Sequence, residues 1–244
     1  MLEGVTETDN PAKLSAAALV RLVQGFYAIF WGLILTAMMA AQLLAGPRPH
    51  AFDVGLLALG LVAVLIGSWR LWRVRLGGDD ADRQRVAWRE RTETLLGTAV
   101  VLAYFAAFFC AWRRVPHSEY LLANALAFLG AGVVYTVLLN RVVSALAPAL
   151  GRRDLVVESK WYGAGSIGFL LLPLVGVLVY AFGEAAIHNT SAVFEILWLL
   201  DRTNIVLVGL LLLPFSLTLS LIWEAKDAML EQLSRSRVCG TTTR

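Results

Sequence analysis

Long, nearly uninterrupted apolar stretches dominate this chain of 244 residues. A helix needs about 20 apolar residues to cross roughly 30 Å of hydrocarbon at about 1.5 Å per residue. Six stretches meet this requirement, and together they predict an all-α polytopic integral membrane protein with a single transmembrane domain. The six predicted transmembrane helices are residues 22–45, 52–72, 94–112, 120–143, 162–183 and 204–223.

The overall composition agrees with membrane insertion and excludes several other classes of protein. Hydrophobic residues make up 58% of the chain and charged residues 16%, whereas a soluble domain carries roughly 45–50% and about 25%. Disordered chains, coiled coils and secreted disulfide scaffolds are therefore excluded. The first ten residues contain Glu3, Glu7 and Asp9 but no Lys or Arg, so we expect no cleavable signal peptide, because such peptides begin with positive charge.

The basic residues predict how the helices are oriented, because Lys and Arg collect in cytoplasmic loops. When both termini are placed in the cytoplasm, all but four of the 21 basic residues fall on the cytoplasmic side. The other four are Arg48, Arg113, Arg114 and Arg202. We therefore expect both termini to lie inside a bacterial-type plasma (inner) membrane. The net charge of +3 follows from this topology, so we expect no nucleic acid as a partner.

Three segments outside the predicted helices are long enough to form structure. Residues 73–92 form a basic cytoplasmic loop, and we expect its second half to be a helix that runs into the third span, with its charges on a solvated face near anionic lipid. Residues 184–203 form an outer segment at the membrane interface. Residues 224–244 form a cytoplasmic helical tail, whose apolar face would dock either on the chain's own loops or on a partner.

Groups that support catalysis or hold a cofactor are scarce within the predicted spans. The three histidines, His50, His117 and His188, fall in outer loops without a close pair, so a metal site formed by them with a nearby glutamate is only a minor alternative. Asp53 and Glu93 lie at the very starts of their spans. We therefore expect no enzyme activity, no metal and no cofactor.

Some polar and small residues do fall within the spans. We single out Asn124, Asn140 and Arg141 as possible buried polar groups, with a carboxylate of another helix as a possible partner for Arg141. Small residues four apart in sequence allow two helices to approach closely. This spacing is found at Ala123, Ala127 and Ala131, and again at Ala164 and Gly168.

Three leucines followed by a proline occur in the middle of each of the last two spans, at Pro173 and at Pro214. Each proline removes a backbone hydrogen bond and predicts a bend in its helix. Paired interrupted helices near the midplane are typical of transporter binding sites, although proline also shapes membrane helices that bind nothing. Pro173 and Pro214 therefore mark either helix breaks or a binding region.

Together these features favour a non-catalytic integral membrane subunit or scaffold that packs against partner membrane proteins within a larger complex. Its partners would be the lipid bilayer and either other membrane subunits or further copies of the same chain. The alternative is a small-solute transporter or channel, with its site near the proline-interrupted fifth and sixth helices.

Overall fold

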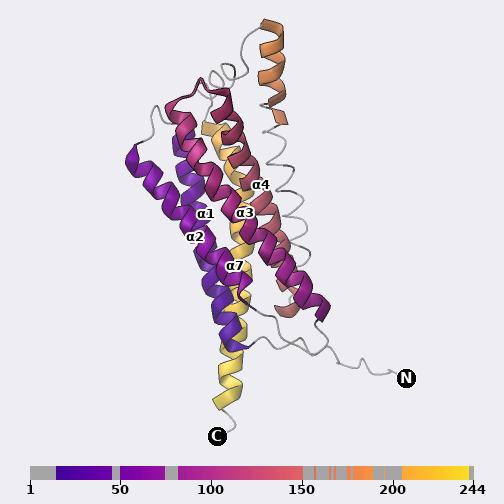
Figure 1. Cartoon of the computed structure of the whole chain (residues 1–244). Helices are drawn as coiled ribbons and strands as arrows, with labels where there is room; N and C mark the ends of the chain where they lie inside the picture. Colours follow the sequence, from indigo (N-terminus) through magenta and orange to yellow (C-terminus); the bar gives the residue numbers. More distant parts are fainter. Residues whose placement is uncertain are drawn as a thin grey trace, which may run out of the picture.

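The computed structural model describes residues 15–45, 50–74, 82–150, 178–188 and 205–241, with six isolated positions between 157 and 195. Every regular element in these ranges is helical, and no strand occurs among them. The all-α prediction is thus confirmed for the part of the chain that is described. The elements are α1 (Ala16–Ala45), α2 (Ala51–Trp72), α3 (Asp82–Arg114), α4 (Glu119–Leu146), the 3-10 turn η1 (Pro148–Leu150) and α7 (Ile205–Thr241), as Figure 1 shows.

Four helices are long and apolar enough to cross a membrane: Ala16–Leu44, Ala51–Trp72, Arg85–Arg114 and Glu119–Leu146. They contain the first four predicted spans almost completely, so the prediction of a membrane-embedded helical protein is confirmed. The fifth predicted span, 162–183, lies mostly outside the described residues. The sixth, 204–223, is the first half of α7. The number six and the cytoplasmic position of the termini stay predictions.

The helices form one elongated bundle. α1 packs against α2, α3 packs against α4, α2 also contacts α3, and α7 lies against α1 and α4. The start of α1 and the end of α7 lie at one end of the bundle, whereas the α1–α2 and α3–α4 connections lie at the other (Figure 1). Helical residues 178–188 extend beyond this second end.

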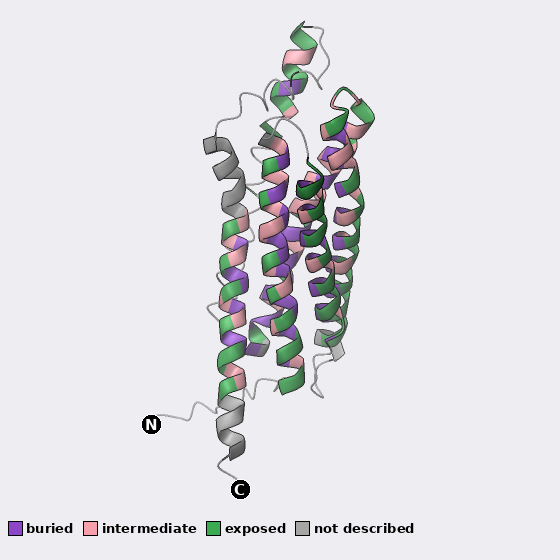
Figure 2. Ribbon diagram, turned by 90° about the vertical axis from the view of Figure 1, so that its left-hand side faces the viewer, coloured by how far each residue is buried: buried purple, intermediate pink, exposed green. Residues whose placement is uncertain are grey.

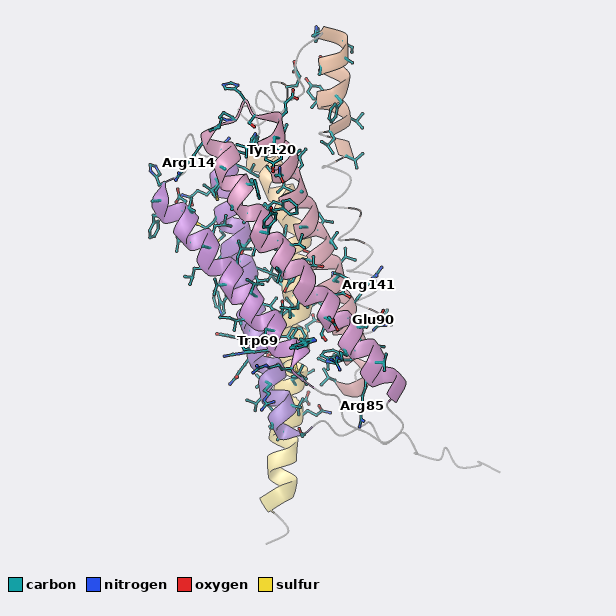
Figure 3. All side chains as sticks on the ribbon, viewed as in Figure 1. Trp69, Arg85, Glu90, Arg114, Tyr120 and Arg141 are labelled. Carbon is teal, nitrogen blue, oxygen red and sulfur yellow. The ribbon has the colours of Figure 1, made fainter. Side chains whose placement is uncertain are left out.

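Charged side chains gather towards the end of the bundle at which α1 begins. Figure 3 shows Arg85, Glu90 and Arg141 near this end, and Arg114 at the opposite end. The aromatic ring of Trp69 lies there too, with the guanidinium carbon of Arg73 3.9 Å from the ring centroid. This pattern places both the start of α1 and most described basic residues at one end of the bundle.

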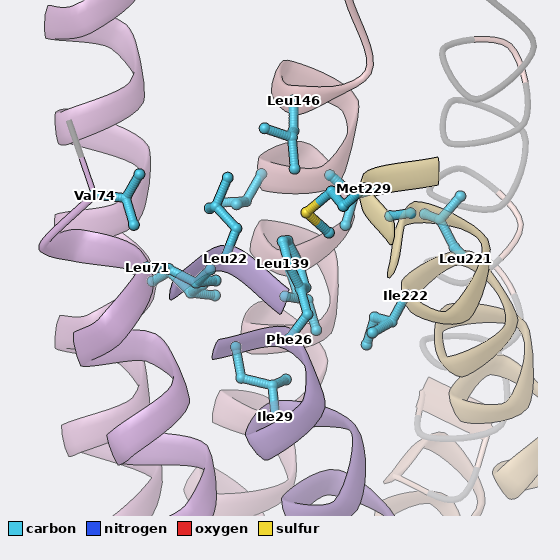
Figure 4. Packing of buried hydrophobic residues seen from close by; sticks show 14 of the residues in the cluster. Leu22, Phe26, Ile29, Leu71, Val74, Leu139, Leu146, Leu221, Ile222 and Met229 are labelled. Carbon is cyan, nitrogen blue, oxygen red and sulfur yellow. The ribbon is translucent and has the colours of Figure 1, made fainter. Parts of the chain in front are cut away.

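Two apolar clusters form the core, one in each half of the bundle, and Figure 2 shows the buried residues along its length. Figure 4 shows the first cluster, in which side chains of α1, α2, α4 and α7 converge. Ala225 and Met229 of α7 are fully buried in it. The apolar face of the predicted tail 224–244 therefore docks, over its described part, on the chain's own bundle.

The predicted loop 73–92 is helical from Asp82 onward and is continuous with α3. Its anchor is Trp88, which is 3% exposed and donates a hydrogen bond from Nε1 to the carbonyl oxygen of Val74 at 3.1 Å. Arg85 and Arg89 on the same helical segment are exposed. The segment is thus amphipathic, with an indole that fastens the start of α3 to the end of α2.

Four glycines allow direct backbone contact between α1 and α2. Gly25 and Gly32 on α1, and Gly60 and Gly67 on α2, are each seven residues apart, and the antiparallel register brings Gly25 to Gly67 and Gly32 to Gly60. A Cβ added to Gly32 would lie 2.8 Å from the carbonyl oxygen of Gly60, and one added to Gly67 would lie 2.7 Å from that of Gly25. Even a methyl group is therefore too large at this contact.

The substitution Gly60→Ala tests this contact, because its Cβ would lie 2.9 Å from the backbone nitrogen of Thr36. We expect it to lower the free energy of unfolding by about 1–3 kcal/mol, the usual cost of overpacking. Gly55→Ala in the same helix is the control, since a Cβ there meets nothing within 4 Å. It should be neutral or stabilise by up to about 1 kcal/mol through helix propensity. Denaturant unfolding in detergent micelles measures both, and equal losses would contradict the assignment.

Candidate functional site

The clearest candidate site is an apolar cavity between α1, α3, α4 and α7, at the level where the two core clusters meet. About 100 Å³ of it is open to a molecule the size of water. Its described lining residues are Leu33, Thr36, Ala37, Ala40, Ala41 and Leu44 of α1, Leu102 of α3, Phe128, Leu129, Gly132 and Tyr135 of α4, and Phe215 of α7.

The cavity has a buried floor and a half-buried rim. On the floor, Leu33, Leu102 and Phe128 are only 3–4% exposed. On the rim, Ala37 and Ala41 are half-buried, so the cavity is partly accessible along this edge. The space exists because α1 presents three alanines and α4 presents a glycine where the helices elsewhere carry larger side chains.

Two of the described lining residues have polar side chains, and both are neutral hydroxyls. Tyr135 is fully buried, and its hydroxyl lies 2.9 Å from Ser68 Oγ on α2, where either oxygen could be the donor. Thr36 is 7% exposed, and its Oγ1 has no hydrogen-bond partner. A cavity with this lining favours an apolar ligand over an ion, because a buried charge needs a partner or a strong dipole.

A second polar contact between helices lies on α4 beyond Tyr135. Asn140 is 2% exposed and donates a hydrogen bond from Nδ2 to Thr218 Oγ1 of α7 at 3.4 Å. The Oδ1 atom of Asn140 is also buried but has no partner. This contact joins α7 to α4 and fixes their relative height.

The polar residues singled out from the sequence lie in different environments. Asn140 makes the interhelical contact just described. Asn124 is half-buried and donates from Nδ2 to the carbonyl oxygen of Tyr120 in its own helix at 2.7 Å. Arg141 is exposed, so its guanidinium leaves the bundle instead of entering a buried ion pair. An exposed guanidinium needs no carboxylate from another helix.

Of the two prolines, the structure describes only the backbone of Pro214. Pro173 lies outside the described residues. Pro214 belongs to α7, which is helical on both sides of it, and its side chain is not among those described. The residue that follows, Phe215, lines the cavity. A cavity therefore lies next to the residue that follows Pro214, where the sequence predicts either a helix break or a binding region.

The contacts that matter most were not those expected from the alanine ladder. Ala123 is exposed, and Ala127 and Ala131 are half-buried, whereas the tightest described contact uses the glycines of α1 and α2. The useful signal was the equal seven-residue spacing of glycines in two successive spans. Thr36, Ser68 and Tyr135 were also missed, and the signal for them was a hydroxyl within an otherwise apolar span.

The polar groups at the end that holds the α1–α2 connection serve local structure. Asp53 accepts hydrogen bonds from the backbone nitrogen of His50 at 3.1 Å and from Gln42 Nε2 at 3.4 Å, which caps α2. His188 Nε2 lies 3.1 Å from Glu184 Oε2, one helical turn earlier. No group of three or more His, Cys, Asp or Glu suited to a metal ion occurs within the described ranges.

Comparison with known proteins adds no relative. No protein-family model matches the chain. No curated protein and no solved structure is significantly similar to it. Its function is therefore argued from the residues and contacts above.

A double-mutant cycle on Tyr135→Phe and Ser68→Ala tests the hydroxyl pair. Interhelical hydrogen bonds in membranes couple their partners by about 0.6 kcal/mol on average and up to about 1.7 kcal/mol, so we expect a coupling in this range. Tyr120→Phe, at an exposed ring on α4, is the control and should change the free energy of unfolding by less than about 0.5 kcal/mol. Strictly additive losses for Tyr135 and Ser68 would mean that the pair does not form.

Proposed function

We propose that this chain is a non-catalytic integral membrane subunit or scaffold that packs against partner membrane proteins within a larger complex. The observation that carries the proposal is the outward face of α3. There an exposed glycine, Gly97, and an exposed tyrosine, Tyr104, lie seven residues apart in the middle of an apolar helix long enough to cross a membrane. We call this surface, with Thr94 and Val101, the α3 face.

Tyr104 is unusual for a side chain that faces only lipid. Its side chain is 61% exposed, and it lies ten residues before Arg114, or about 15 Å along the helix. Tyrosine facing lipid prefers the membrane interface to the midplane. Its ring is held by Phe105 and Phe108, with centroid distances of 5.3 and 5.2 Å. A fixed aromatic ring with a polar tip is the type of group that anchors protein interfaces.

Gly97 adds a second reason. A Cβ at this position would meet nothing within 4 Å, so the chain's own packing does not require a glycine. A glycine in a helix costs about 1 kcal/mol relative to alanine. The hydroxyl of Thr94, about one turn before Gly97, donates a hydrogen bond to the carbonyl oxygen of Glu90 at 2.8 Å. This small, flat surface allows the backbone of a second helix to approach α3.

The spanning helices leave much of their surface for outside contacts. In the most apolar window of each of the four candidate spans, between 28% and 39% of the residues are buried inside the chain. The rest are half-buried or exposed, and the exposed ones are free to contact lipid or other membrane proteins. Because lipid tails are as apolar as leucine, close packing of small residues and not hydrophobicity selects the face that a partner uses.

We also infer the finer topology that the sequence predicted, with six transmembrane helices and both termini in the cytoplasm of a bacterial-type inner membrane. It is supported by the position of Arg85 and Arg141 at the end of the bundle where α1 begins. Cytoplasmic segments collect such residues. Accessibility of single cysteines placed in the two termini would test the orientation.

A second candidate function is the movement of a small apolar solute. It is favoured by one observation, that Phe215 beside Pro214 lines the apolar cavity. Solute uptake by vesicles that contain this chain alone would favour it over a scaffold.

The scaffold proposal is tested by isolating the tagged full chain in mild detergent and measuring its assembly by native mass spectrometry. We expect partner membrane proteins, or further copies of the chain, to remain bound. Gly97→Leu should release them, because a leucine would hold a neighbouring helix away from α3. Gly55→Leu is the matched control, as another exposed glycine with nothing within 4 Å of an added Cβ, and it should leave the assembly intact.

Two results would count against the proposal, and they differ in meaning. Recovery of the native chain as a lone monomer would contradict the function itself. An assembly that resists Gly97→Leu would contradict the role of the α3 face while leaving the function in place.

A further inference from the structure

We propose that the cavity between α1, α3, α4 and α7 binds one aliphatic chain of a bilayer lipid, held in a fixed position as part of the folded protein. This inference concerns the opposite side of α3 from the α3 face, and it does not depend on the proposed subunit function.

The chemistry of the lining selects an aliphatic ligand. A buried water molecule needs two to four polar partners, whereas Thr36 Oγ1 is the one described lining side-chain atom buried without a partner. The hydroxyl of Tyr135 is already paired with Ser68. The other described lining residues are aliphatic, aromatic or glycine. Methylene groups therefore match this surface better than water or a polar solute.

The geometry of the cavity matches one leaflet. Its lining on α1 extends from Leu33 to Leu44, a rise of about 16 Å at about 1.5 Å per residue. Half of the hydrocarbon layer is about 15 Å thick. Leu33 lies near the middle of the predicted span 22–45, and Leu44 lies at the end where α1 leads into α2. A lipid chain lying along this lining would run from the midplane towards the interface, with part of its length inside the cavity of about 100 Å³ and the remainder in the surrounding bilayer.

The position of the rim explains how a lipid chain enters. Ala37 and Ala41 are half-buried and belong to a helix long enough to cross a membrane. On the opposite wall, a Cβ added to Gly132 would meet only Leu102 Cδ1, at 3.9 Å. The small residues on both walls leave a slot between α1 and α4 that is partly accessible along the half-buried rim. α1 packs mainly on α2 and α7, and α4 on α3 and α7, so a chain in this slot would fill a place where the two helices are not direct neighbours.

Photocrosslinking tests the proposal. The full chain is reconstituted in phosphatidylcholine vesicles that contain a small fraction of phosphatidylcholine with a diazirine near the end of one acyl chain. After irradiation, we expect label on the buried floor residues Leu33 and Leu102, which surrounding lipid does not reach. The exposed residues Leu59 and Val62 of α2 lie away from the α3 face, contact bulk lipid and provide the internal reference.

Ala37→Phe fills the slot, and we expect it to abolish label on the floor while label on Leu59 and Val62 persists. Gly132→Val fills the slot from the other wall and provides a second variant if the first fails to fold. Met38→Phe is the matched control, because Met38 is 56% exposed on the same helix, and it should leave floor labelling unchanged. Floor labelling that is absent in the native chain, or that persists in both filled variants, would overturn the proposal.

Thr36→Val separates an aliphatic occupant from a polar one. It replaces the hydroxyl with a methyl group of similar size, so an aliphatic chain should bind as before and floor labelling should not fall. Loss of the label in this variant would show that the occupant needs the hydrogen bond, and the proposal of a lipid chain would be overturned.

Discussion

The backbone contact between α1 and α2 is the constraint on which the rest of the bundle depends. At Gly32 and Gly60 any side chain would meet the opposite backbone, so the two helices can meet in only one register. In that register Ser68, beside Gly67, faces α4 and pairs with Tyr135. Thr36 lies against Gly60 and also lines the cavity. A shift between α1 and α2 would therefore have two effects at once. It would break an interhelical hydrogen bond, and it would move one wall of the cavity.

The polar groups inside the bundle contribute more to specificity than to energy. Interhelical hydrogen bonds in membranes contribute about 0.6 kcal/mol on average, which is small beside the packing of a whole helix. Their effect is that Ser68 and Tyr135, and likewise Asn140 and Thr218, meet only when each pair of helices has the correct height and rotation. Apolar surfaces tolerate several such arrangements. A hydroxyl or amide that has one possible partner is compatible with only one of them.

Helix length could be predicted from the sequence because membrane crossing imposes it: span 52–72 matches α2 (Ala51–Trp72), and span 120–143 lies within α4 (Glu119–Leu146). Pairing was harder to predict. The ladder at Ala123 has the spacing of a close contact, yet Ala123 is exposed, because spacing shows that a helix can pack closely without showing on what. The cavity could not be predicted at all. It is the space that side chains from four helices leave unfilled, and it depends on the rotation of every helix.

The cavity and the α3 face are related through a single turn of α3. Leu102 forms part of the cavity floor and Tyr104 points outward, and two residues correspond to about 200° around a helix of 3.6 residues per turn. A lipid chain against Leu102 would hold this turn from the inside, at the level where a partner would contact it from outside. Should both proposals hold, filling the cavity would favour docking on α3. By thermodynamic linkage, docking would then favour filling by the same factor. Assembly of the protein would in that way depend on the lipid around it.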